Sequence, residues 1–135
     1  MTSGVEQTKP GCPFCVANGL LVNAPVFAND RFYFLDSIDP DLPLAGMIVP
    51  HRHSETPFEL TPVEFAALPE MLERARQHLA GHAPNGFTVG WNVGAAGGQE
   101  VFHTHLHIIA RFDHAPDAGV GIRRVLKYSR LEHFS

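Results

Sequence analysis

The sequence predicts an α+β domain with an antiparallel sheet, and three observations support this fold class. Apolar and aromatic runs at residues 26–28 and 32–35 lie on either side of the turn signal Asn29-Asp30, which is typical of a β-hairpin. A helical repeat of apolar residues occupies the middle of the chain, and two further strand-like runs follow it. Strands in hairpins combined with one or two helices indicate an α+β fold.

The elements between the first hairpin and the last strands follow from local signals. Residues 36–43 are acidic and rich in turn formers, which predicts a loop, and Leu44–Pro50 is a third strand that ends at a proline. Thr61 and Glu64 match a capping box around Pro62, so a helix begins there. Its apolar side chains recur at helical spacing as far as Ala80: Phe65, Leu68, Leu72, Ala75 and Leu79.

Pro69 interrupts this helical pattern. It removes a backbone donor and crowds the preceding turn, so we expect a kink or a break in the helix at this position.

The last two predicted strands, Phe87–Asn92 and Val101–Phe112, are joined by a glycine-rich loop. The second strand carries histidines at three alternate positions, His103, His105 and His107. Because strand side chains alternate between faces, the three imidazoles share one side. The opposite, mostly apolar side is formed by Phe102, Thr104, Leu106 and Ile108. A row of imidazoles on one face can hold a metal ion, or it can bind and attack an anion.

Size and charge exclude several classes of protein. The 135 residues, 44% of them apolar, suit one domain at residues 11–135 after a flexible tail at residues 1–10. A net charge of -4 without a long basic stretch argues against a nucleic-acid binder. The N-terminus is polar and no apolar segment is long enough for a membrane span, so we expect a cytoplasmic protein.

Cys12 and Cys15 form a Cys-x-x-Cys motif, which by itself is typical either of half a zinc site or of a redox pair. His53 and His103 would complete a closed tetrahedral site, with His51 as the competing histidine. Such a site leaves no position for water, so its metal would be structural. A pair of buried, inert thiols is the remaining alternative.

The segment Gly97–Ile109, GGQEVFHTHLHII, resembles the signature of the histidine triad superfamily, in which a Gly-Gln pair precedes histidines that alternate with hydrophobic residues. The resemblance extends upstream to Cys12 and is weak beyond Phe112. It implies a five-stranded sheet that continues across a homodimer. As in many bacterial members, it also implies a zinc ion held by Cys12, Cys15, His53 and His103.

The same resemblance implies roles for the site residues. His105 would attack the α-phosphorus of a nucleotide to give a nucleotidyl-histidine, with His107 and Gln99 stabilising the phosphoryl oxygens. The implied substrate contacts are Asp36 for the ribose, Asn92 and Gly98 for the phosphate, and Phe27 and Ile38 for the base. Turn chemistry is the alternative for Gln99 and Asn92, and an ordinary loop acid is the alternative for Asp36.

Two departures from the family pattern leave the leaving group open. Leu44 and Ala45 stand where many relatives have Gly-His, and Glu100 stands where phosphoramidate hydrolases often have Ser or Thr. We therefore expect a hydrolase of nucleoside polyphosphates or phosphoramidates, with a purine nucleotide as substrate and no cofactor in the chemical step. The alternatives are a nucleotidyltransferase of the same superfamily, a zinc hydrolase with three histidine ligands, and a nucleotide-binding regulatory module with little catalysis.

Basic side chains gather after the triad strand, at Arg111, Arg123, Arg124 and Lys127. Guanidinium groups would stabilise a highly charged leaving nucleotide, whereas a neutral amine would gain nothing from them. This predicts a preference for dinucleoside polyphosphates. Ordinary surface charges or dimer contacts are the alternative.

Overall fold

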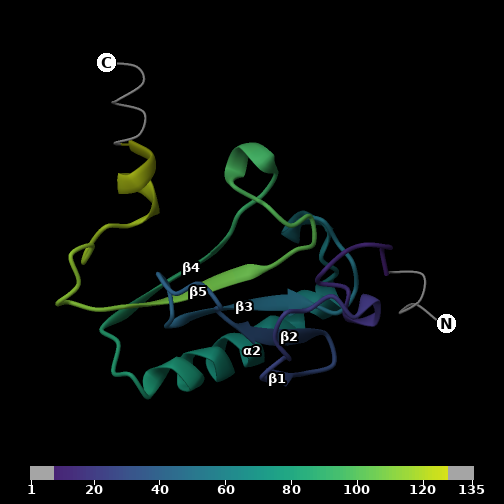
Figure 1. The fold of residues 1–135 in the computed structure, drawn as a ribbon, viewed down its shortest axis with the longest axis horizontal. Helices are drawn as coiled ribbons and strands as arrows, with labels where there is room; N and C mark the ends of the chain where they lie inside the picture. The colour runs from purple at the N-terminus through teal and green to yellow at the C-terminus, as the bar shows by residue number, and fades with distance from the viewer. Residues whose placement is uncertain (1–7, 128–135) are drawn as a thin grey trace.

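The computed structural model describes residues 8–127, which form a five-stranded antiparallel sheet with one long helix (Figure 1). The strands lie in the order β1-β2-β3-β5-β4. Their bounds are Phe27–Ala28 (β1), Phe32–Asp36 (β2), Ala45–Pro50 (β3), Gly86–Trp91 (β4) and Leu106–Arg111 (β5). The predicted α+β class and five-stranded sheet are confirmed. Residues 1–7 of the predicted tail and residues 128–135 of the predicted domain lie outside the described range.

The long helix, α2, spans Pro62–Ala80 and begins as the sequence predicts. Thr61 accepts a hydrogen bond from the backbone N–H of Glu64, whose carboxylate accepts one from the N–H of Thr61, so the capping box is complete. The expected break at Pro69 is absent, because the helix continues through it. Pro69 and Phe65 both lie on the exposed side, where water can reach the carbonyl that loses its helical bond.

Short helical turns complete the described part of the chain. They are η1 (Val16–Asn18), η2 (Pro57–Glu59) and η3 (Ala95–Gly97), and a further helix covers residues 122–127. Among residues 8–127, no helix is long and apolar enough to cross a membrane.

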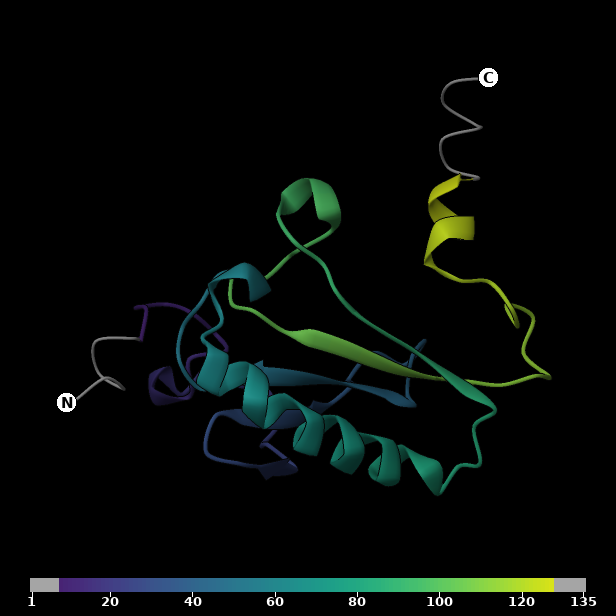
Figure 2. The same cartoon turned by 180° about the vertical axis from the view of Figure 1, so that it is seen from behind.

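Helix α2 packs against one face of the sheet, which is the rear face in Figure 1 and the front face in Figure 2. The buried core between them contains Phe32, Phe34, Ile48, Leu106 and Ile108 from the strands and Leu68, Met71, Ala75 and Leu79 from the helix. Met71 is completely buried although it is absent from the predicted core positions, whereas the predicted Phe65 is 45% exposed.

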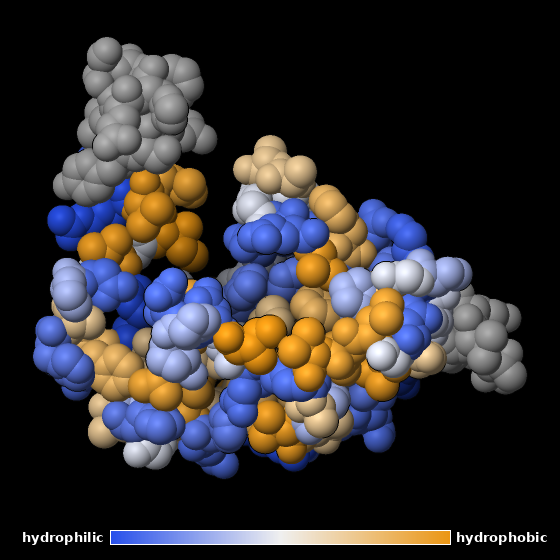
Figure 3. Space-filling view, in the orientation of Figure 1, coloured by the Kyte–Doolittle hydropathy of each residue, from blue (hydrophilic) through white to orange (hydrophobic). Residues whose placement is uncertain are grey.

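The opposite face carries the N-terminal segment and the histidines. Phe14 and Leu21 of that segment pack on strands β2 and β3, against a second buried cluster made of Tyr33, Leu35 and Val49. Figure 3 views this face and shows the surface hollowed between the η3 loop and the C-terminal segment. The sheet is thus closed by α2 on one side and remains partly open over β5 and β4 on the other.

Strand β5 is shorter than the predicted Val101–Phe112. It begins at Leu106, where the ladder to β3 starts. Before it, the backbone N–H of Thr104 donates to the carbonyl oxygen of Ser54 at 2.7 Å instead of joining the ladder. Thr104 is buried as predicted, but Phe102 is 45% exposed. The other strand boundaries agree with the prediction to within one residue.

An ion pair joins the exit of β3 to the start of α2. The Arg52 guanidinium donates to both carboxylate oxygens of the buried Glu64, at 3.0 and 2.8 Å. Although burial alone would raise the pKa of Glu64, its hydrogen bonds with Arg52 and Thr61 hold that pKa below the ordinary value. This bidentate pair fixes the backbone next to His53.

We predict that Gly46→Ala lowers the free energy of unfolding by roughly 1–3 kcal/mol, the usual cost of overpacking. A Cβ at Gly46 would collide with the ring of Phe34 and lie 2.7 Å from the carbonyl oxygen of Leu35. Gly86→Ala is the matched control, since no atom lies within 4 Å of a Cβ there. Urea unfolding measures both variants, and equal midpoints would contradict the packing.

Candidate functional site

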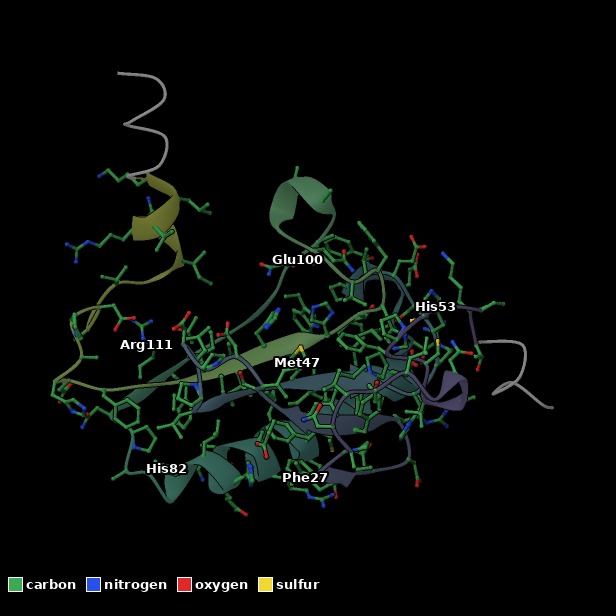
Figure 4. All side chains as sticks on the ribbon, in the orientation of Figure 1. Phe27, Met47, His53, His82, Glu100 and Arg111 are labelled. Carbon is green, nitrogen blue, oxygen red and sulfur yellow. The ribbon has the colours of Figure 1, made fainter. Side chains whose placement is uncertain are left out.

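A cluster of sulfur and nitrogen atoms lies where the N-terminal segment meets the sheet. The thiol of Cys12 is 3.4 Å from Nδ1 of His103, and the thiol of Cys15 is 3.4 Å from Nδ1 of His53. The two Nδ1 atoms lie 3.2 Å apart, and all four ligand atoms lie within 4.8 Å of one another. Figure 4 shows His53 beside the N-terminal segment. This cluster could hold a metal ion.

The protonation of the cluster also suits a metal. Nε2 of His103 lies 2.8 Å from the carbonyl oxygen of Pro50, so Nε2 carries the hydrogen and Nδ1 presents its lone pair to the thiols. Burial lowers the pKa of His103 to about 4 and holds that of His53 below its ordinary value, so both rings are neutral at pH 7. Burial raises the pKa of the Cys15 thiol, so its thiolate depends on a bound cation.

His51, the competing ligand, lies outside this cluster. Its Nε2 is 2.9 Å from the carbonyl oxygen of Asn29, and its ring lies 5.6 Å from that of Tyr33. Of His51 and His53, only His53 belongs to the cluster with the thiols within the described residues.

His105 is 8% exposed and is held in one orientation. Its Nδ1 lies 2.7 Å from the carbonyl oxygen of His103, so Nδ1 carries the hydrogen and Nε2 keeps a lone pair. Burial lowers the pKa of His105 and outweighs the His103 carbonyl and the Glu100 charge, which raise it. A neutral imidazole with an unprotonated Nε2 can act as a nucleophile at pH 7.

His107 stands beside His105 in strand β5. Their ring centroids are 4.9 Å apart, and the sheet register places His107 between Met47 and Gly90. Figure 4 shows Met47 in the middle of the face opposite α2. Nε2 of His107 is buried without a hydrogen-bond partner among residues 8–127, and burial together with the adjacent His105 lowers its pKa. This nitrogen is thus available to a bound anion.

The three imidazoles do not converge on one point. Nδ1 of His103 faces the thiols and its Nε2 faces Pro50, while Nδ1 of His105 faces a backbone carbonyl. This geometry argues against a zinc hydrolase in which all three histidines bind one ion.

Gln99 is buried and closes the loop between β4 and β5. Its Oε1 accepts a hydrogen bond from the backbone of Gly94 at 2.8 Å, and its Nε2 donates to the carbonyl oxygens of Glu55 and Val101 at 2.6 and 3.1 Å. Both amide hydrogens are therefore used within the loop, as the turn-chemistry alternative expects. A contact from Gln99 to a phosphate stays a prediction, and it requires one of these bonds to break.

Asn92 and Gly98 lie together at the same end of the hairpin. A Cβ on Gly98 would lie 3.6 Å from Cγ of Asn92, and Gly98 adopts the left-handed conformation with φ 93°. Since Trp91 packs toward the α2 core, the alternation of the strand places Asn92 on the histidine side. Both residues are thus on the face where a phosphate contact is predicted.

Asp36, the predicted ribose contact, is turned away from the histidines. Its carboxylate lies 2.8 Å from Nε2 of His78 on α2. The alternation of β2 explains this, because Asp36 shares a side with Phe34, which is buried in the core against α2. The structure does not bring Asp36 to His105, and its ribose contact stays a prediction without geometric support.

The two predicted base contacts have different surroundings. Phe27 stacks on Phe34 with ring centroids 4.8 Å apart and packs against the α2 core. Figure 4 shows Phe27 beside α2. Ile38 is exposed in the loop after β2. Phe34 itself is completely buried.

Two neighbours of the triad histidines were not predicted from the sequence. The ring of Phe14 lies 5.2 Å from that of His105. Ile122 lies over Gly90, since a Cβ at Gly90 would be 3.9 Å from its Cδ1. The position of Phe14 between two predicted metal ligands was a usable signal, whereas no local pattern marks Ile122.

A family model described as the HIT domain matches residues 23–114, which is more than half of the chain. The chain belongs to the HIT family. The matched region contains His53 and the three triad histidines, while Cys12 and Cys15 precede it.

Curated relatives of this HIT protein have similar lengths and low identity. Protein HitA of Neisseria gonorrhoeae is 29% identical over 100 residues, covering 73% of this chain and 94% of HitA. An uncharacterised HIT-like protein of Saccharolobus solfataricus is 30% identical over 112 residues, covering 78% of each chain. One from Borreliella burgdorferi is 27% identical over 117 residues, covering 84% of this chain and 82% of its own.

Solved structures of HIT proteins share the fold. A HIT family protein from Bacillus anthracis matches with a TM-score of 0.70 and 20% identity, covering 93% of this chain and 97% of its own. A HIT family hydrolase from Clostridium thermocellum gives 0.66 and 24%, with coverages of 82% and 99%. A histidine triad protein from Clostridium difficile is 29% identical with a TM-score of 0.58, covering 76% and 91%.

Proposed function

We propose that this HIT protein is a nucleotide hydrolase that attacks the α-phosphorus of a nucleoside polyphosphate or phosphoramidate through His105. The observation that carries the proposal is the 2.7 Å hydrogen bond from Nδ1 of His105 to the carbonyl oxygen of His103. It leaves the lone pair of Nε2 free in a ring that burial keeps neutral. Membership of the HIT family supports nucleotide chemistry in general.

The reaction has two displacement steps. Nε2 of His105 gives its lone pair to the α-phosphorus, and the bond to the leaving group breaks with its electron pair departing on that group. Water then attacks the same phosphorus, the P–N bond breaks, and its electron pair returns to Nε2 while the water proton passes to solvent. Between the steps the ring is positively charged, and the carbonyl of His103 stabilises it by accepting the Nδ1–H bond.

Donors around the phosphoryl oxygens stabilise the charge that develops there. We assign this role to His107, because its Nε2 is buried and unpaired among the described residues. Asn92 and Gly98 lie on the same face and are the further candidates, with Gln99 after rearrangement of its loop contacts.

His107 also bears on the choice between hydrolysis and transfer. By resemblance, nucleotidyltransferases of the superfamily usually have glutamine at the third triad position, so a histidine there favours water as the acceptor. A regulatory module with little catalysis would bind a nucleotide without accumulating the covalent intermediate, which the first experiment below tests.

We propose that the second part of the site binds structural zinc. Tetrahedral zinc with Zn–S bonds of about 2.3 Å and Zn–N bonds of about 2.0–2.1 Å places its ligand atoms roughly 3.3–3.8 Å apart. The separations of 3.2, 3.4, 3.4 and 3.6 Å in the structure are close to this geometry. The four ligands would be Cys12, Cys15, His53 and His103. Since they leave no position for water, the ion would hold the fold and take no part in hydrolysis.

The remaining expectations belong to the same proposal. We propose a purine nucleotide as substrate, a cytoplasmic location and a homodimer whose sheet is continuous. Strand β4 lies at an edge of the sheet, where a second copy can add its own strand.

We expect His105→Ala to keep the fold and nucleotide binding but to form no covalent adduct. The imidazole of His105 lies outside the core packed against α2, and its buried neighbours Thr104 and Leu106 are unchanged. Incubation with an adenylyl phosphoramidate, followed by mass spectrometry of the intact protein, measures the adduct. His82→Ala, an exposed histidine after α2, is the control. Unfolding of His105→Ala, or an adduct that persists in it, would contradict the assignment.

The purified protein should contain one zinc ion per chain, and Cys12→Ser should lower the melting temperature more than it lowers turnover. The reason is that the cluster joins the N-terminal segment to the sheet, whereas the chemical step uses His105. Elemental analysis, thermal unfolding and steady-state kinetics on the same samples measure the three quantities. If no zinc is found, the metal proposal fails and the nucleotide chemistry stands.

We predict that dinucleoside polyphosphates are better substrates than phosphoramidates. The double substitution Arg123→Ala with Arg124→Ala should reduce the ratio of the two kcat/KM values by roughly tenfold, the contribution of one charge-assisted contact. The helix that carries both arginines begins beside the histidine face, where Ile122 lies over Gly90. Arg76→Ala, on the exposed side of α2, is the control. Equal losses on both substrates, or a phosphoramidate preference in the parent protein, would refute this prediction.

A further inference from the structure

We infer that Phe14 is a positioning residue that holds the imidazole of His105 in its reactive orientation. Its effect on catalysis rests on the proposed function, whereas its effect on the ring rests on geometry alone. Phe14 is outside the histidine triad and outside the predicted ligand set.

Two rings contact the imidazole of His105. Phe14 meets it edge-on, with ring centroids 5.2 Å apart and planes at 81°. His107 lies 4.9 Å away at 72°. The hydrogen bond to the His103 carbonyl favours one orientation and one tautomer, but a single bond cannot by itself stop the ring from tilting until the bond breaks. The edge-on contact with Phe14 removes that freedom.

Phe14 can do this because it is itself fixed. Its carbonyl oxygen accepts a hydrogen bond of 2.5 Å from the hydroxyl of Tyr33, which is completely enclosed. Its ring packs on the buried cluster of Tyr33, Leu35 and Val49. The aromatic side chain therefore stands on a rigid part of the sheet.

The backbone on both sides of Phe14 is also held in place by contacts of its neighbours. Cys12 and Cys15 direct their thiols to His103 and His53. Asn18 holds the same loop, because its side chain donates to the carbonyl oxygen of Cys12 at 2.9 Å and its backbone N–H donates to that of Cys15 at 2.9 Å. Phe14 thus connects the ligand cluster to the nucleophile by direct contact, in addition to the connection through the backbone of His103.

Loss of a positioning residue changes the kinetic constants in a way that loss of stability does not. If the ring of His105 tilts, Nε2 moves away from the line of attack, and displacement by about 1 Å can lower a rate by about 100-fold. Phe14→Leu keeps an apolar side chain but lacks the flat ring. We therefore expect kcat to fall by roughly 10- to 100-fold while KM changes much less.

The deciding experiment reads the tautomer of His105 directly. In nitrogen-15 spectra of the histidine side chains, the parent protein should show His105 only as the Nδ1–H tautomer, and Phe14→Leu should add the Nε2–H tautomer at unchanged zinc content. Phe58→Leu is the matched control, since Phe58 is 85% exposed on η2. It should leave both the spectrum and kcat as in the parent.

A single Nδ1–H tautomer in Phe14→Leu, or a kcat no lower than that of Phe58→Leu, would overturn the inference. Phe14→Met, with a flexible side chain of similar size, replaces Phe14→Leu in both measurements if the leucine variant unfolds. The spectra need no nucleotide. A parent protein that forms no adduct would therefore refute the proposed function, while the tautomer measurement would still decide the role of Phe14 in orienting the ring.

Discussion

The backbone carbonyl of His103 is the group on which the geometry of the site depends. It fixes the tautomer of His105. Its own position is fixed because both nitrogens of the His103 side chain have partners, the carbonyl oxygen of Pro50 on β3 and the thiols of the N-terminal segment. A buried imidazole without these partners would carry a large cost, since polar groups removed from water need hydrogen bonds. One fully enclosed side chain therefore joins three segments and orients the neighbouring His105, the proposed nucleophile.

The two faces of the sheet differ because different segments pack on them. Helix α2 closes one face with a continuous apolar core, which makes the strands rigid. The other face receives only short pieces of chain in the described structure, so side chains of β5 remain within reach of a ligand. A rigid sheet beneath a partly open face is a suitable support for groups whose mutual distances must hold during a displacement reaction.

Local rules predicted the parts of this fold that depend on neighbouring residues. The capping box at Thr61 needed no knowledge of distant contacts, and the grouping of Cys12, Cys15, His53 and His103 followed from residue type with the family resemblance. The sequence did not predict contacts that depend on the face a strand residue takes, such as the 2.8 Å contact between the Asp36 carboxylate and Nε2 of His78. Pro69 is tolerated because its side of α2 is exposed, and Phe14 meets His105 only through the tertiary fold.

Ala45, where the resemblance expects histidine, changes how the phosphate can be held. It is buried and pairs with Ile109, and since Met47 pairs with His107, Ala45 lies on the same face as the triad. The strand beside His107 thus offers a methyl group in place of a ring donor. In the proposed mechanism, stabilisation of the phosphoryl oxygens would therefore come from His107 and from groups outside β3. The helix of residues 122–127 meets this face directly, because Ile122 lies over Gly90, the residue paired with His107. The same helix carries Arg123, Arg124 and Lys127, which is why the proposed leaving-group contact is assigned to this helix.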